Sequence, residues 1–179
     1  MGNFGENNKS KILPKYLNKE EISQILQTAK QFNYRDFIIL LTLWRTGVRN
    51  SEVINIRKND LKDGKLIVRQ GKGKKDRVVP LESELENLLR LYSDRLGYRD
   101  VLFSLSDRQI RNIVYKYSPD DWDVSPHTFR HSFAVYCLKQ GMNLRTLQKI
   151  LGHSSLTTTQ IYLDVIGKDI ADDFGKVVW

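Results

Sequence analysis

The segment that most constrains the fold is the apolar run at residues 36–46. From Phe37 to Trp44 the only polar side chain is Thr42. A helix on a protein surface keeps one polar face, so a helix that is apolar on nearly every side must be covered by its neighbours. Gly47 follows at once, and glycine readily takes the left-handed conformation that ends a helix. The run therefore predicts a central, buried helix around which the rest of the chain packs.

Length, charge and cysteine content narrow the class of protein. With 179 residues the chain has the size of one domain with its own core. A formal charge of +8 and a pI near 9.5 favour a polyanionic partner, although charge alone does not separate this from a merely basic protein. Cys137 is the single cysteine, which excludes a disulfide framework and favours a reducing, cytoplasmic compartment. The apolar run is shorter than the roughly 20 residues that span a bilayer, so we expect no membrane partner.

Local patterns predict an α+β fold that is mainly α-helical, with a small antiparallel sheet of two or three strands. β-prone runs at residues 65–69 and 77–79 flank a loop rich in glycine and lysine, and Asp63-Gly64 supplies the preceding turn. Cap residues Asn18, Ser106 and Ser125 each precede apolar positions at helical spacing. Further helices are expected at residues 85–97, 143–151 and 155–165.

The same patterns predict the domain limits. Residues 1–12 are polar and read as a leader or linker, residues 13–165 as one domain, and residues 166–179 as a tail. The tail carries Ile170, Phe174 and Trp179, an apolar load that needs a surface to dock on.

All three histidines, His127, His131 and His153, lie between residues 125 and 165, in the same stretch as Arg130 and Tyr162. Phosphoryl chemistry without a metal needs fixed cations around the phosphate. The planar guanidinium of Arg130, together with that of Arg49 upstream, could hold two phosphate oxygens each. His127 lies three residues before Arg130 and is expected on the same helix face.

The remaining roles fall to a nucleophile and an acid. Tyr162 can form a stable but reversible phosphate ester, and its phenol, with an ordinary pKa near about 10, would be helped by a positive pocket. Lys72 on the predicted hairpin is the natural general acid. Taken singly, each residue has an ordinary explanation as a cap, packing residue or solvated turn. One cysteine and three histidines without a carboxylate cluster make poor metal ligands, so no metal site is expected.

Five short motifs together resemble the catalytic domain of the tyrosine recombinase or phage integrase family, most of all its Xer-like members. They are TGVRNSE at residues 46–52, GKGKKDR at 71–77, SPHTFRH at 125–131, LGHSS at 151–155 and TTQIY at 158–162. The resemblance runs from about residue 13 to Tyr162.

The resemblance implies a transesterification in which Tyr162 attacks a DNA phosphate, forms a 3′-phosphotyrosyl link and frees a 5′ hydroxyl, with no cofactor. It makes Arg49, Lys72, His127, Arg130, His153 and Tyr162 catalytic, Glu52 and His131 supporting residues, and Lys74, Lys75 and Arg77 contacts to DNA. Family members act as tetramers on two duplexes, so we expect a homotetramer on double-stranded DNA and a monomer or weak oligomer without it. The tail then packs on a neighbouring subunit or folds back on its own.

The family pattern differs from this sequence in two respects. A helical core-binding domain normally precedes the catalytic one, so a fragment or a minimal member is expected, and the span from Lys72 to His127 is short. Two other functions stay open at this point: a relaxase like type IB topoisomerases, which religates the same strand, and a DNA-binding regulator with an idle site.

Overall fold

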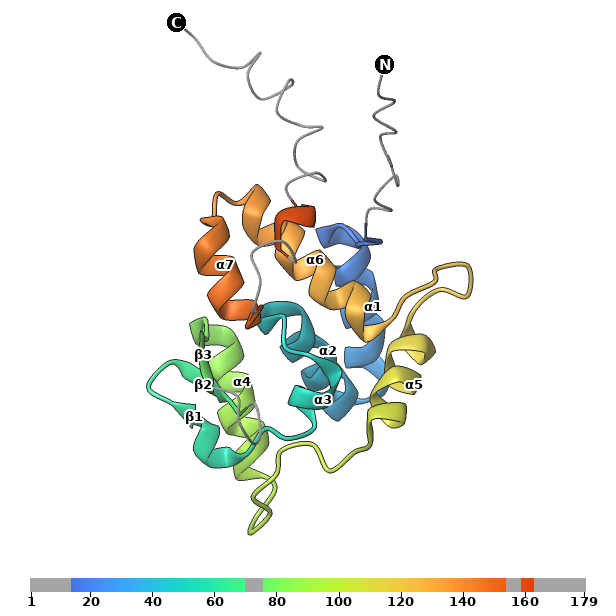
Figure 1. The fold of residues 1–179 in the computed structure, drawn as a ribbon. Coiled ribbons are helices and arrows are strands. Elements are labelled where there is room, and N and C mark those ends of the chain that lie inside the picture. Colours follow the sequence, from blue (N-terminus) through green and yellow to red (C-terminus); the bar gives the residue numbers. More distant parts are fainter. Residues whose placement is uncertain (1–13, 70–75, 154–158, 163–179) are drawn as a thin grey trace, which may run out of the picture.

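Helix α2 (Tyr34–Thr46) runs through the middle of the molecule, as its sequence predicts (Figure 1). Our computed structural model describes residues 14–69, 76–153 and 159–162. Every residue of α2 from Asp36 to Thr46 is buried except Arg45. The helix packs against α1, α3, α4, α5 and α6. These five helices therefore cover the sides of α2.

The chain forms its elements in the following order: α1 (Lys19–Phe32), α2, α3 (Asn50–Val53), the 3-10 turn η1 (Lys58–Asp60), β1 (Leu61–Lys62), β2 (Lys65–Val68), β3 (Arg77–Pro80), α4 (Ser83–Asp94), α5 (Asp107–Tyr117), α6 (Pro126–Lys139) and α7 (Leu144–Leu151). Residues 159–162 are helical as well. The predicted α+β class, mainly helical with a small sheet, is confirmed. The predicted extent of the last helix on either side of residues 159–162 lies outside the described residues.

The sheet is antiparallel in the order β1-β2-β3, with Leu66 opposite Leu61 on one side and Val79 on the other. Asp63 and Gly64 both take positive φ in the tight turn between β1 and β2, as their sequence predicts. Helix α4 packs against β1 and α7 packs against β3. The sheet thus fixes the position of α7, which carries part of the site.

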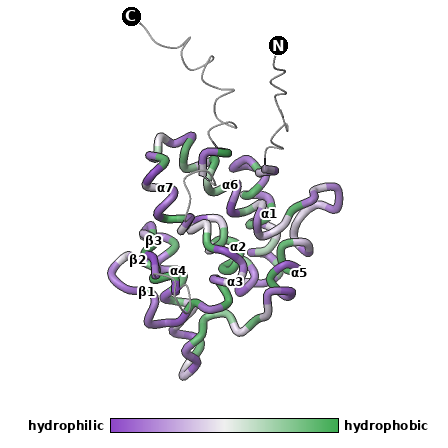
Figure 2. Tube along the Cα trace, viewed as in Figure 1, coloured by the Kyte–Doolittle hydropathy of each residue, from purple (hydrophilic) through white to green (hydrophobic). Residues whose placement is uncertain are grey.

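Helix ends follow the predicted caps. Asn18 and Ser106 form capping boxes with Glu21 and Gln109, and Ser125 caps α6, which has Pro126 in its first turn. Figure 2 shows hydrophobic residues along α2, inside the molecule, and hydrophilic ones along the outer edge of the sheet. In the described part of the chain, no helix combines the length and hydropathy needed to cross a membrane.

Gly47 ends α2 at a crowded turn. Its φ of +61° is in the left-handed region, and a Cβ placed there would collide with the ring of Phe133 and the side chain of Leu151. Because α6 and α7 supply those two side chains, the glycine lets three helices meet at one point.

Gly47→Ala is therefore expected to lower the free energy of unfolding more than Gly97→Ala does. Gly97 has nearly the same φ, +58°, but no atom lies within 4 Å of the position that a Cβ would take there, so it isolates the backbone cost. That cost is about 1–2 kcal/mol, and overpacking at Gly47 adds about 1–3 kcal/mol. Urea unfolding of both variants measures the difference, and equal losses would show that the contact with Phe133 and Leu151 is unimportant.

Candidate active site

One carboxylate, that of Glu52, holds two arginines in place. Its Oε1 accepts hydrogen bonds from Arg49 Nη1 at 2.9 Å and from Arg77 Nη1 at 2.6 Å. Its Oε2 accepts from Arg77 Nη2 at 2.8 Å and from the Arg49 backbone N–H at 2.6 Å. The Glu52 side chain is only 9% exposed, so these contacts are shielded from water. The predicted supporting role of Glu52 agrees with this placement.

These contacts control the charge of Glu52. Burial raises its pKa, but hydrogen bonds from the Arg77 side chain and the Arg49 backbone, together with the charges of both arginines, lower the pKa to about 2. The carboxylate is therefore ionised at any pH at which the protein functions.

Three consecutive carbonyl groups at the end of α7 each accept a hydrogen bond from a different arginine. Arg77 Nε donates to the Ile150 carbonyl at 2.6 Å, Arg130 Nη2 to the Leu151 carbonyl at 2.7 Å, and Arg49 Nη2 to the Gly152 carbonyl at 3.3 Å. The last carbonyls of a helix lack partners within it and carry the negative end of the helix dipole. They therefore suit three converging cations, and they bring Arg49 and Arg130 to neighbouring peptide groups.

Arg130 is the most enclosed of these cations, with 4% of its surface exposed. Its Nη1 also donates to the Gly47 carbonyl at 2.5 Å. Burial lowers its pKa to about 10, helped by the charges of Arg49 and Arg77, while Glu52 and Tyr162 act in the opposite direction. The guanidinium remains charged at neutral pH, and its contacts with described residues use two of its five N–H donors. The others can bind an anion.

His153 comes directly after Gly152 in the chain and lies near the same three arginines. Its Nδ1 lies 2.9 Å from the Thr159 hydroxyl. Burial, followed by the neighbouring Arg130, Arg49, Arg77 and His131, lowers its pKa to about 4. At neutral pH the imidazole is uncharged and can donate one hydrogen bond to an anion held by the arginines.

Tyr162 is nearly enclosed, with 2% of its surface exposed. Its hydroxyl lies 2.8 Å from Nδ1 of His131 on α6, and the two rings are 5.7 Å apart. Burial raises the pKa of the phenol, and the charge of Arg130 opposes this in part. The positive pocket expected around Tyr162 is present, but desolvation outweighs its effect on the phenol.

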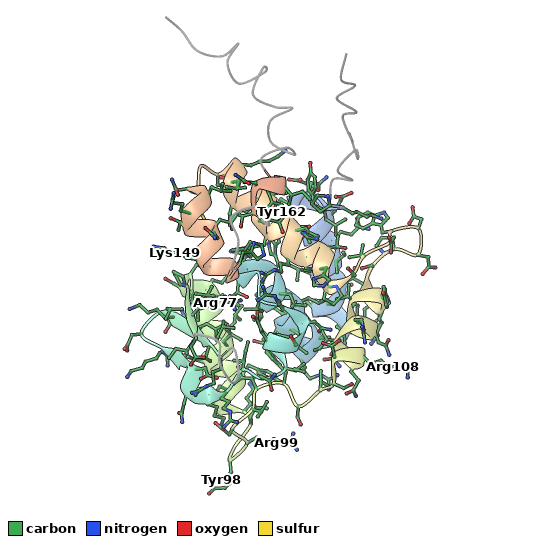
Figure 3. The ribbon with its side chains drawn as sticks, viewed as in Figure 1. Arg77, Tyr98, Arg99, Arg108, Lys149 and Tyr162 are labelled. Atoms are coloured by element: carbon green, nitrogen blue, oxygen red, sulfur yellow. The ribbon has the colours of Figure 1, made fainter. Side chains whose placement is uncertain are left out.

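The structure brings Arg49, Arg130, His153 and Tyr162 into one region, as the sequence predicts. It places two other residues differently. His127 is exposed at the first turn of α6, whereas Arg130 is buried and donates to the Gly47 and Leu151 carbonyls. Arg77, expected to contact DNA, is 8% exposed and bound to Glu52 and Ile150, so its placement fits a positioning role instead. In Figure 3, Arg77 lies on the strand side of α7 and Tyr162 beside α6.

Some predicted residues cannot be placed, and some groups of the site were not predicted. Lys72, Lys74 and Lys75 lie outside the described residues. Sequence reasoning did not identify Thr159 or the α7 carbonyls. The placement of Gly152 after an apolar helix indicated where that helix ends, but no local signal indicated which side chains would meet it. Within residues 14–69, 76–153 and 159–162, no group of three or more metal-ligating side chains is present.

A pocket with clustered guanidinium groups, uncharged imidazoles and a buried phenol defines a class of protein: one that binds a phosphate-like anion beside a nucleophile. The family follows from comparison. Residues 15–167 match the phage integrase family, and the chain belongs to it.

Tyrosine recombinase XerA of Thermococcus kodakarensis is 39% identical over 166 residues, which cover 86% of this chain and 59% of that protein. The chain spans about three fifths of the length of the curated relatives it matches. The crystal structure of XerA recombinase superposes with a TM-score of 0.81 at 31% identity, over 94% of this chain and 67% of that one. XerH site-specific recombinase, bound to a palindromic difH substrate in a post-cleavage complex, gives a TM-score of 0.76 at 25% identity, over 92% and 54%.

Replacing Glu52 tests the network, because its charge contributes to stability in a defined pH range. The pKa of about 2 in the folded state lies below the ordinary 4.5. The ionised carboxylate therefore stabilises the fold above about pH 4.5, and this contribution disappears as the pH falls toward about 2. The shift corresponds to about 3 kcal/mol.

We expect Glu52→Gln to lower the free energy of unfolding by about 3 kcal/mol at pH 7, and the gap to the parent protein to narrow by pH 3. Urea unfolding of both proteins at pH 7 and at pH 3 measures this gap. Glu84→Gln is the control, because Glu84 is exposed and reaches Arg45 only at 3.8 Å. A gap that is absent, or the same at both pH values, would contradict the assigned role of Glu52.

Proposed function

We propose that this chain is the catalytic domain of a site-specific DNA recombinase that cleaves and rejoins strands through Tyr162. The observation that carries this proposal is the pairing of Arg49 and Arg130 with the adjacent carbonyls of Gly152 and Leu151. Two guanidinium groups that are held at adjacent carbonyls can bind the same phosphate. The charge of Arg130 also lowers the pKa of the Tyr162 phenol, against the effect of burial.

In the proposed reaction the Tyr162 oxygen attacks phosphorus, and the bond to the 5′ oxygen breaks. Arg49, Arg130 and His153 offset the charge that develops on the non-bridging oxygens. The leaving oxygen takes a proton from Lys72, which the resemblance assigns as the general acid. The 3′-phosphotyrosyl link conserves the energy of the broken ester, so a 5′ hydroxyl from another strand can reverse the step without a cofactor.

The partners follow from the family. XerH is seen bound to its difH substrate, and we propose double-stranded DNA as the partner of this chain also. We propose a homotetramer on DNA and a monomer or weak oligomer without it, with Lys74 and Lys75 contacting the duplex and the cytoplasm as the location.

The proposed division is a leader at residues 1–12, a catalytic domain at 13–165 and a tail at 166–179. For the tail, a cavity of about 290 Å³ between α2 and α6, lined by Trp44, Phe133 and Tyr136, is a suitable docking place on the same or a neighbouring subunit. Sedimentation of the protein–DNA complex, with and without residues 166–179, distinguishes docking on the same subunit from docking on a neighbour. Only docking on a neighbour makes assembly on DNA depend on the tail.

A covalent adduct with DNA tests the proposed function directly. The chain is incubated with a pool of nicked duplexes of randomised sequence, and protein-bound DNA is recovered under denaturing conditions and sequenced, which removes the need to know the target. We expect an adduct with the parent chain and with Tyr98→Phe, and none with Tyr162→Phe. Tyr98 is fully exposed and lies at the other end of the molecule from Tyr162 (Figure 3).

An adduct that survives Tyr162→Phe would contradict the proposed nucleophile. The recovered duplex also separates a recombinase from a relaxase, because only a recombinase gives products joined between two different duplexes.

Binding to DNA should weaken as salt rises. If Arg49 and Arg130 together neutralise one phosphate, affinity falls at least about threefold between about 50 and about 200 mM salt, and further contacts steepen the fall. Fluorescence anisotropy with Tyr162→Phe measures this without cleavage. Affinity that stays level or rises with salt would be evidence against phosphate contacts.

A further inference from the structure

The group that faces the Tyr162 hydroxyl is His131. Its Nδ1 is 2.8 Å from that oxygen, whereas the centroid of the His127 ring lies 6.3 Å from that of the His131 ring. Among the described residues, no hydrogen bond joins His127 to the phenol. We propose that His131 is the catalytic base that takes the proton from Tyr162, an inference that rests on the proposed function and assigns His131 a direct part in the reaction.

The surroundings of His131 keep it ready to accept a proton. Burial, together with the nearby His127 and Arg130, lowers its pKa to about 4. His131 in turn lowers the pKa of His153, and the Tyr162 hydroxyl lies opposite the His131 ring. At neutral pH the ring is therefore uncharged, with one nitrogen free to accept. In the tautomer with the proton on Nε2, that nitrogen is Nδ1, which lies against the phenol.

The proton balance of the step is simple. As the Tyr162 oxygen bonds to phosphorus, its proton moves to His131 Nδ1, and the 5′ oxygen that leaves takes a proton from the acid. Rejoining reverses both transfers.

Binding of DNA also makes His131 a stronger base. A bound phosphate neutralises part of the charge of Arg130, one of the groups that disfavour protonation of His131. The bound phosphate thus raises the basicity of His131, while burial, the largest cause of its lowered pKa, remains.

The first test needs no DNA. In protein labelled with ¹⁵N-histidine, we expect His131 to carry its proton on Nε2 at neutral pH, and the Nδ1 resonance to shift in Tyr162→Phe. Phenylalanine keeps the ring of Tyr162 and removes only the hydroxyl. A proton on Nδ1 would make His131 the donor to the phenol and would overturn the inference.

The second test uses the duplex recovered by covalent trapping. His131→Asn keeps a polar group near the position of Nδ1 but cannot take up a proton. We expect its rate of adduct formation to fall about 100-fold and to rise with pH, because hydroxide must then remove the proton, while noncovalent DNA affinity stays unchanged. We also expect added imidazole to restore part of the rate in His131→Ala, which a structural role would not allow.

The two proposals fail in different ways. If the parent chain forms an adduct and His131→Asn forms it at the same rate and with the same pH profile, the role of His131 is wrong and the recombinase proposal stands. If the parent chain forms no adduct with any duplex in the pool, both are overturned.

Discussion

The free carbonyl groups at the end of α7 are the feature on which the site depends. Ile150, Leu151 and Gly152 each accept one arginine, and the three arginines come from positions 21, 73 and 103 residues away along the chain. Cations so close together repel one another. Burial is the largest cause of the lowered pKa of Arg130, and the charges of Arg49 and Arg77 lower it as well. The helix terminus and the buried Glu52 carboxylate offset that repulsion, so a cationic pocket can exist before any anion is bound.

Neutral groups complete the pocket. His131 and His153 are both held uncharged by burial and by neighbouring cations, and the Tyr162 phenol is protonated for the same reason of desolvation. Positive charge therefore lies on the arginines, while the groups that handle protons remain able to exchange them. An incoming phosphate changes this balance, because it brings negative charge to the point where the cations meet.

The elements of the fold could be predicted because their signals are local. The apolar run before Gly47, the Asp63-Gly64 turn and the Ser125 cap each fix the backbone within a few residues. One boundary was wrong: α4 ends at Asp94, three residues before the position that the sequence indicated. Residues that share a motif were likewise assigned together, although Arg77 turns inward to Glu52.

The site could be predicted as a set of residues but not as a network. The spacing of three residues predicted that His127 lies beside Arg130. In the structure, α6 buries Arg130 and leaves His127 at the surface. The spacing of four residues places the His127 ring near the ring of His131. Which side of α6 faces the core depends on α2 and α7, and neither is visible in the motif. The pairing of arginines with the α7 carbonyls is equally non-local.

The central claim is that Arg49 and Arg130 form one anion site, and titration with inorganic phosphate tests it most directly. With the side chains of arginine labelled with ¹⁵N, we expect both guanidinium signals to shift together with one dissociation constant, and Arg49→Ala to weaken the response of Arg130. Signals that saturate at different phosphate concentrations, or a response of Arg130 that is unaffected by Arg49→Ala, would show that the two arginines do not share a phosphate.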